Sequence, residues 1–241
     1  MEPIWWLGRF LLYPLRLLFV VRIDGKERVP RNGPVILASN HVSFLDPLLL
    51  LWLGERTRRK VRFLAMAELW RSRFMRFFLV HTKQIPVTRE SSSAAHSLLH
   101  AARALGAGEC VGIYPEGKIS TDFEPLPGKT GAARLAALSE APVIPVGVWG
   151  AHRVWPKGRK RKFRLGVALT IVVGEPVRVT EDDDLFDATD RVMGGIASCV
   201  ATARRIYPQH PRRREGDWWV RAPETAVVRP TPRGSTNDRW A

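Results

Sequence analysis

The segment PVILASNHVSFLDP, residues 34–47, contains a short apolar run, a group of polar side chains and the start of a helix. The apolar run Val35–Ala38 follows Gly33 and ends at polar residues, which is typical of a buried strand. Asp46 followed by Pro47 predicts a helix that has an aspartate N-cap and a proline in its first turn. Ligands of open α/β sheets bind where strands lead into helices, so we expect the site in this loop.

The alternation of short apolar strands with helices continues along the chain. It predicts an α/β fold in which a largely parallel central sheet is flanked by helices. Strands are expected at residues 61–65, 85–87, 110–114, 143–148 and 165–173, and helices at residues 70–78, 91–107, 131–139 and 187–206.

The N-terminal segment, residues 1–21, is apolar and aromatic but contains Arg9 and Arg16. These charges interrupt it too often for a membrane-spanning helix, which needs about 18 consecutive uncharged residues. A signal peptide is not expected either, because the segment lacks a basic n-region and a cleavage site. The two arginines share one helix face, so we expect a membrane-interface helix over residues 1–21. Packing of this helix on the core of the protein is the alternative.

The whole chain is strongly basic, with 38 Lys and Arg residues against 23 Asp and Glu residues and a net charge of +15. Such a charge favours polyanionic partners, namely nucleic acid, anionic lipid headgroups or phosphorylated substrates. Nine tryptophans favour the membrane, because Trp and Arg both suit the bilayer interface. Residues 208–241 form a basic tail rich in Pro and Arg, which we expect to be poorly ordered or loosely docked. Trp218 and Trp219 in this tail can dock on the body or contact lipid.

The loop at residues 40–46 offers a histidine and an aspartate. His41 can act as a general base near neutral pH, and a carboxylate can fix its tautomer and stabilise the imidazolium. The two residues would not align on a regular helix, so His41 must lie on the loop and Asp46 at the helix start. A surface histidine beside an ordinary capping aspartate is the alternative that these two residues leave open.

Four stretches in order resemble the motifs of the glycerolipid acyltransferases, the family of the lysophosphatidic acid acyltransferases. One motif alone would be a weak signal, but four in order at suitable spacing are specific. A further stretch is similar to the Lys-Gly element of the family, and the resemblance covers roughly residues 20–175. The four motifs are Asn40-His41 with Asp46, Val87-Thr88-Arg89, Tyr114–Lys118 and Ala141–Val146, and the Lys-Gly element is Gly128–Ala132.

The resemblance implies transfer of a fatty acyl group from a thioester to a hydroxyl of 1-acyl-sn-glycerol 3-phosphate (lysophosphatidate), which gives phosphatidic acid. His41 would take the hydroxyl proton and Asp46 would orient His41, without an acyl-enzyme, metal or cofactor. The expected donor substrate is acyl-CoA, with acyl carrier protein as the alternative. Glycerol 3-phosphate or another lysolipid or glycolipid is the alternative acceptor. Residues 22–207 would form the acyltransferase domain, held monotopically on membrane lipids at the cytoplasmic face of the cell membrane.

Five further residues take substrate-binding roles within this resemblance. Arg89 would bind the acceptor phosphate, for which a guanidinium fork is suited, and Lys129 is a second phosphate ligand at a helix start. Glu116 would hold the acceptor or order its loop, and backbone N–H groups near Gly117 are candidate oxyanion donors. Lys118 replaces the small hydroxyl residue usual in the family, so it can add a phosphate contact or change the acceptor.

Two stretches concentrate basic charge. Arg56–Arg76 contains eight basic residues and one acidic residue, and ends among aromatic side chains. Lys157–Arg164 contains six basic residues in eight and follows Trp155. We expect the first stretch to contact the membrane, where each basic side chain contributes about 1 kcal/mol at an anionic surface. The second stretch can be a solvated loop or contact the phosphates of coenzyme A.

Other classes of protein fit less well. A nucleic-acid partner is not expected, because the chain lacks a helix-turn-helix, an RRM signature and a zinc ligand set. A P-loop would need glycine at Phe123, and a serine hydrolase would need a G-x-S-x-G motif that is missing. Two cysteines, Cys110 and Cys199, exclude a disulfide framework. An anionic-lipid or nucleic-acid binding protein without catalysis remains the alternative from a different class.

Overall fold

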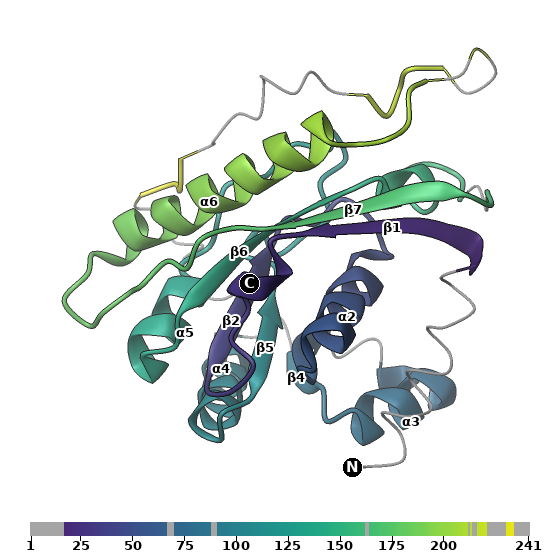
Figure 1. The fold of residues 1–241 in the computed structure, drawn as a ribbon. Coiled ribbons are helices and arrows are strands. Elements are labelled where there is room, and N and C mark those ends of the chain that lie inside the picture. The colour runs from purple at the N-terminus through teal and green to yellow at the C-terminus, as the bar shows by residue number, and fades with distance from the viewer. Residues whose placement is uncertain are drawn as a thin grey trace.

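The described residues form one sheet of seven strands in the order β1-β7-β6-β2-β5-β3-β4. β1 and β7 lie side by side in it (Figure 1). A computed structural model of the chain describes residues 17–66, 70–87, 91–161, 164–211, 213, 216–220 and 230–233. The strands are β1 (Phe19–Asp24), β2 (Val35–Ser39), β3 (Val61–Met66), β4 (Ile85–Val87), β5 (Cys110–Ile113), β6 (Val143–Trp149) and β7 (Val167–Val173). The helices are α2 (Asp46–Thr57), α3 (Arg73–His81), α4 (Ser91–Gly106), α5 (Gly131–Ser139) and α6 (Leu185–Arg205), with short 3-10 turns η1 (Lys26–Arg28) and η3 (Ala151–Arg153).

The strands run in two directions. β2, β3, β4, β5 and β6 are parallel to one another, whereas β7 is antiparallel to β6 and β1 is parallel to β7. The connection from β6 to β7 contains η3 but no crossover helix, and therefore brings the chain back in the opposite direction. The prediction of a largely parallel sheet is confirmed, and the β1–β7 pair is the exception that the sequence did not reveal.

This topology gathers several loops at one edge of the sheet. The carboxyl ends of β2, β5 and β6 lie there, and β1 and β7 begin there because they run the other way. We call this the carboxyl edge. Loops at the carboxyl ends of parallel strands form the ligand sites of open α/β sheets.

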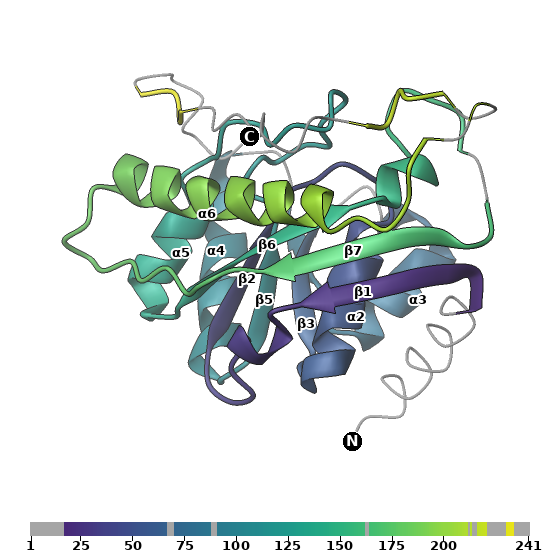
Figure 2. The same cartoon turned by 45° about the horizontal axis from the view of Figure 1, so that its top comes forward.

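Helices cover both faces of the sheet, as Figures 1 and 2 show. α6 packs along β6 and β7, α5 lies beside α6, and α4 lies beside α5. α2 lies against the opposite face. All residues of β2, β6 and β7 are buried, which is why these strands read as continuous apolar runs in the sequence.

The expected helices and strands occur close to their predicted positions, with shifts at several ends. α6 begins at Leu185, earlier than predicted, because the side chain of Asp184 caps it by accepting from the backbone N–H groups of Phe186 and Asp187. β7 begins at Val167 rather than at Leu165, because the chain turns at Gly166 before it enters the sheet. These differences move element ends and leave the order of elements unchanged.

The N-terminal boundary needs a correction. A membrane-interface helix was expected over residues 1–21, but residues 19–21 lie in β1, where they pair with β7. Residues 1–16 lie outside the described part of the chain, so the interface helix there stays a prediction. Across the described residues, no helix has the length and apolarity needed to cross a membrane.

The basic tail, residues 208–241, is partly docked on the body. Trp219 is 2% exposed, and its carbonyl accepts a hydrogen bond from His152 Nε2 at 3.2 Å. The guanidinium of Arg153 lies 4.0 Å from the centre of the Trp219 ring, a cation–π contact. Of the two alternatives for Trp219, docking on the body is therefore the one observed.

Candidate active site

The loop after β2 is anchored by Asn40. The side-chain Oδ1 accepts from the backbone N–H of Val148 at 2.7 Å, and Nδ2 donates to the carbonyl of Val148 at 3.1 Å. Asn40 is fully buried, so its amide continues the hydrogen bonding between β2 and β6 past the end of β2. The amide thereby fixes the point at which the chain leaves the sheet. Sequence reasoning missed this role, because the sequence of the motif does not show which distant residue Asn40 bonds.

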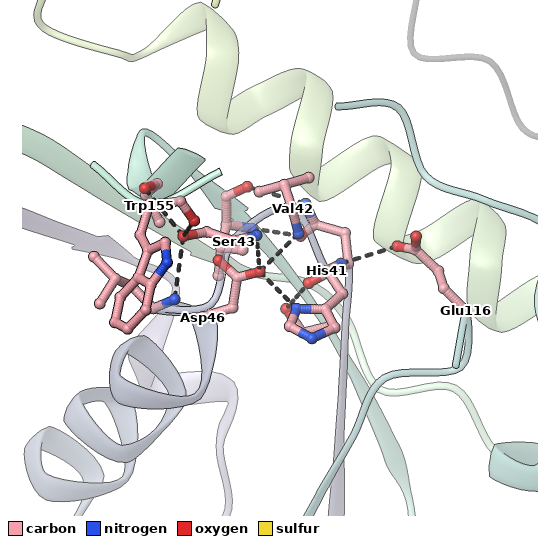
Figure 3. Close-up of polar contacts among 11 residues, drawn as sticks. His41, Val42, Ser43, Asp46, Glu116 and Trp155 are labelled. Carbon is pink, nitrogen blue, oxygen red and sulfur yellow. Dashed lines mark hydrogen bonds and ion pairs between the residues drawn. The ribbon is translucent and has the colours of Figure 1, made fainter. Parts of the chain in front are cut away.

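Asp46 organises this loop through one carboxylate oxygen, as Figure 3 shows. Its Oδ2 accepts from His41 Nδ1 at 2.8 Å and from the backbone N–H groups of Val42 and Ser43 at 2.7 Å each. The expectation that Asp46 is the N-cap of α2 is wrong, because Leu45 occupies the cap and Asp46 is the first residue of the helix. The carboxylate points back to the loop instead. It is fully buried and lies at the N-terminus of α2, the positive end of the helix dipole.

His41 is held in a defined orientation. Because Oδ2 of Asp46 already accepts two backbone N–H groups, we assign the imidazole proton to Nδ1, which leaves a lone pair on Nε2. The ring stacks on Tyr114, with centroids 4.1 Å apart and planes inclined by 18°. The side chain keeps 17% exposure, so a reactant can reach it. This arrangement has the geometry of a general base with an orienting carboxylate.

Tyr114, the first residue of the motif Tyr114–Lys118, forms one wall of the site. Its ring lies between His41 and Phe63, with nearly parallel planes on both sides. Burial, together with the nearby charge of Asp46, raises the pKa of its hydroxyl well above 10. The phenol therefore stays neutral under His41. No local sequence signal indicates this contact, because the two residues belong to separate loops.

Ser43 connects the loop to η3. Its hydroxyl lies within hydrogen-bonding distance of the carbonyls of Ala151 at 3.1 Å and Trp155 at 2.8 Å, and it accepts from the N–H of Leu45. The backbone N–H of Phe44 also donates to Trp155. The hydroxyl of Ser43 is thus used to hold the loop and does not face a reactant.

The loop after β5 holds the backbone of His41. Glu116 Oε1 accepts from the N–H of His41 at 3.0 Å, and the N–H of Ser120 donates to the carbonyl of His41 at 2.7 Å. Glu116 is 2% exposed, and burial raises its pKa to about 8, although hydrogen bonds from the backbone of His41 and Leu126 oppose the rise. Of the two roles expected for Glu116, the observed contacts are those of loop ordering.

Gly117 makes the sharp turn of this second loop. Its φ of 66° is in the left-handed region that favours glycine. Its N–H donates to the carbonyl of Tyr114 at 3.0 Å. An oxyanion donor among the backbone N–H groups near Gly117 stays a prediction. The neighbouring Lys118 is exposed to solvent.

Lys129 lies against the same turn. Its backbone N–H donates to the carbonyl of Pro115 at 2.9 Å. A Cβ atom added to Gly117 would lie 3.2 Å from Cε of Lys129, so the lysine side chain passes over the glycine. The structure therefore brings His41, Asp46, Glu116 and the two lysines together at the carboxyl edge.

Arg89 is not placed. β4 ends at Val87 beside β3, as the sequence predicted, but residues 88–90 lie outside the described part of the chain. Among the residues that are described, no group of three or more His, Cys, Asp or Glu side chains could hold a metal ion.

Both loops around His41 lie within a region that matches a known protein family. The sequence pattern of the acyltransferase family matches residues 20–149, which is more than half of the chain and includes every site residue named above up to Trp149. The chain belongs to the acyltransferase family. The resemblance inferred from the four motifs is thereby confirmed.

This chain matches different shares of the length of its relatives within the family. A 1-acyl-sn-glycerol-3-phosphate acyltransferase of Bacillus subtilis is 28% identical over 157 residues, which are 65% of this chain and 73% of the relative. A chloroplastic enzyme of the same name from Brassica napus is 26% identical over 178 residues, and the chain spans about half (49%) of its length. The crystal structure of the PlsC acyltransferase from Thermotoga maritima has the same fold, with a TM-score of 0.68 at 23% identity, over 88% of this chain and 81% of that one.

Proposed function

We propose that this protein transfers a fatty acyl group from an acyl thioester to the free hydroxyl of 1-acyl-sn-glycerol 3-phosphate, which forms phosphatidic acid. The observation that carries the proposal is the 2.8 Å hydrogen bond between His41 Nδ1 and Asp46 Oδ2 at the carboxyl edge. Family membership supports the acyl transfer, and the printed names of the relatives support this acceptor.

The reaction proceeds by direct transfer. Nε2 of His41 takes the proton of the acceptor hydroxyl as its oxygen attacks the thioester carbonyl. The tetrahedral intermediate then collapses, the carbon–sulfur bond breaks, and the leaving thiolate takes the proton from the imidazolium. Asp46 keeps the ring oriented and offsets its positive charge during this cycle. The engaged hydroxyl of Ser43 supports a route without an acyl-enzyme.

The acceptor phosphate is bound by basic side chains around the site. Lys118 and Lys129 flank Gly117 beside the loop that holds His41. Arg89 follows the edge strand β4 by two residues, and we assign it the bidentate contact to the phosphate. Lys118 replaces a small hydroxyl residue of the family pattern, and this difference supports glycerol 3-phosphate or another lysolipid or glycolipid as the second candidate acceptor.

The donor that we propose is acyl-CoA, with acyl carrier protein as the second candidate. Since the acceptor and the product are lipids, we place the protein on membrane lipids at the cytoplasmic face of the cell membrane as a monotopic protein. The net charge of +15 supports contact with anionic headgroups.

The test is thiol release from palmitoyl-CoA by protein purified in detergent. The acceptors are lysophosphatidate, glycerol 3-phosphate, a lysophospholipid with a blocked phosphate, and none. His41→Ala is compared with His100→Ala, a matched histidine that is exposed on α4 away from the site.

We expect thiol release that needs a free phosphate on the acceptor, is lost in His41→Ala and is kept in His100→Ala. Release with the blocked lipid alone would contradict a phosphate clamp at Arg89. If palmitoyl-CoA gives no release, the same panel is run with palmitoyl-acyl carrier protein. Absence of release with both donors, together with salt-sensitive binding to DNA or lipid, would overturn the proposed acyltransferase activity. It would support a binding protein without catalysis.

A further inference from the structure

Large apolar side chains are exposed at the carboxyl edge, next to the active site. Phe44, which lies in the loop between His41 and Asp46, is 49% exposed. Leu165 before β7 is 76% exposed, and Leu17 before β1 is 82% exposed. Single exposed apolar residues are common on soluble proteins, so these three need a second observation before they indicate a partner.

The second observation is the basic loop between β6 and β7. Lys157, Arg159, Lys160 and Arg161 are all exposed on it. The guanidinium of Arg161 lies 5.7 Å from the ring of Trp155, which is also the ring that packs against Phe44 with centroids 5.5 Å apart. A basic loop therefore adjoins a pair made of exposed Phe44 and half-buried Trp155. This composition is typical of surfaces that bind at the lipid headgroup boundary.

This loop runs from the catalytic loop to the first strand. At one end, Ser43 forms a β-bridge with Pro156. At the other end, the N–H of Gly166 donates to the carbonyl of Leu18 at 2.7 Å. The apolar side chains and the charges thus belong to one continuous rim along the carboxyl edge. We call this surface the docking rim, and its residues are Leu17, Phe44, Trp155, Lys157–Arg161 and Leu165.

We propose that the docking rim seats the carboxyl edge on an anionic bilayer, so that the active site opens at the membrane surface. The inference rests on the proposed function, because an acceptor in a bilayer requires the site to reach it. The apolar side chains enter the boundary between headgroups and acyl chains, and the four basic side chains contact anionic headgroups.

Two basic residues of the other stretch, Arg56–Arg76, are engaged within the protein, and membrane contact of that stretch stays a prediction. Arg59 is buried and donates to the carbonyls of Pro30, Gly33 and Gly108, which precede β2 and β5. Arg62 is paired with Glu109. These charges hold strand starts at the edge of the sheet opposite the active site.

The first test is binding to vesicles of equal parts phosphatidylglycerol and phosphatidylcholine. The rim variant combines Lys157→Gln, Arg159→Gln, Lys160→Gln and Arg161→Gln. The control removes the same charge from exposed positions near the opposite edge, with Arg31→Gln, Arg58→Gln, Arg103→Gln and Arg178→Gln. We expect the rim variant to partition about a hundredfold more weakly than the unmodified chain and the control to change less than threefold. Equal weakening in both variants would overturn the rim.

The second test reports insertion of the apolar side chains. Leu165→Cys is labelled with an environment-sensitive nitrobenzoxadiazole dye, and Arg103→Cys serves as the reference. Selective labelling is feasible because Cys110 and Cys199 are buried, and burial raises their pKa to about 12 and about 11. Anionic vesicles should shift the emission of the dye to the blue at position 165 and leave it unchanged at position 103. An unchanged emission at both positions would contradict insertion of the rim.

Activity separates the rim from the proposed function. In neutral detergent micelles the rim variant should release thiol from palmitoyl-CoA with an unchanged KM, whereas in anionic vesicles its rate should fall with its binding. A raised KM for palmitoyl-CoA with unchanged vesicle binding would overturn the rim and assign the loop to coenzyme A. Rim-dependent binding without thiol release in any format would support the rim and overturn the proposed function.

Discussion

The two loops around His41 each contain a buried carboxyl group, but the two groups hold different parts of the histidine. In the first loop, which follows β2, Asp46 bonds the imidazole and two backbone N–H groups through one oxygen. In the second loop, which follows β5, Glu116 bonds the backbone N–H of His41. The first loop thus sets the orientation of the ring, and the second sets the position of the residue.

This difference indicates that the motif of His41 and Asp46 and the motif of Glu116 have separate structural roles. Both acids are nearly inaccessible to solvent, so burial alone does not tell them apart. What differs is the atom of His41 that each one contacts, and this contact decides whether a substitution should change the chemical step or the stability of the site. Each prediction below changes one side of this comparison.

The largest effect is expected for Asp46→Asn, which acts on the first loop. The introduced asparagine amide is neutral and cannot replace the charged acceptor of the ring and of two N–H groups. The tautomer of His41 is then no longer fixed, and its imidazolium loses the negatively charged partner. We expect kcat to fall by about 10²–10⁴-fold with the fold retained. Thiol-release kinetics and circular dichroism measure both quantities. A fall of less than tenfold would mean that the orientation of the ring by Asp46 is unimportant.

Trp219→Ala tests whether the first loop depends on support from outside. Ser43 holds this loop to η3, and His152 of η3 donates to the carbonyl of Trp219. Removal of the buried indole should lower the free energy of unfolding by about 3–5 kcal/mol, measured by urea denaturation. Trp218→Ala is the matched control, and it should cost less because Trp218 is only half-buried. Equal losses in the two variants would contradict this assignment.

Glu116→Gln tests the second loop through pH. The folded chain keeps the Glu116 proton up to about pH 8, while the unfolded chain releases it near 4.5, so the free energy of unfolding falls as pH rises through this window. The fall amounts to at most about 1.4 kcal/mol per pH unit. Glutamine can keep the bond from the N–H of His41 without this penalty.

Thermal unfolding at intervals from pH 5 to pH 8.5 measures the difference between the two proteins. The midpoint of the variant relative to the unmodified chain should rise with pH and level off above pH 8. Parallel curves would show that Glu116 does not titrate in this way. The comparison is internal, because all other groups titrate in both proteins.

The smallest effect is expected for Gly117→Ala. A left-handed φ costs a non-glycine residue about 1 kcal/mol, and the new Cβ would press on Cε of Lys129. With Lys129 displaced, we expect KM for lysophosphatidate to rise by about threefold while kcat is largely kept. Gly106→Ala is the control, because that glycine has open space and no left-handed φ. Equal KM values in the two variants would contradict a role of Lys129 at the phosphate.

Much of this fold could be predicted from the sequence, because apolar runs report burial directly. The segments around Val35–Ser39 and Val143–Trp149 are continuous apolar strands, and they are buried on both faces. The proximity of His41 and Asp46 could also be predicted, since both lie in one short loop.

Contacts between distant segments could not be predicted in the same way. The stacking of Tyr114 on His41 depends on two strands whose neighbourhood the local pattern does not encode. The antiparallel pairing of β6 with β7 depends on a connection that contains no crossover helix. The prediction of Asp46 as the N-cap of α2 was wrong for a similar reason. The carboxylate of Asp46 points to the preceding loop and away from its own helix.

The pairing of β1 with β7 also bears on how the chain folds during synthesis. β1 precedes the other described strands in the sequence, but it lies at the end of the sheet beside β7, which follows them all. The five parallel strands can assemble before that partner exists, while the nascent chain carries an unpaired strand edge. The sheet can therefore close from its centre outwards, and the β1–β7 pair forms only after β7 has been synthesised.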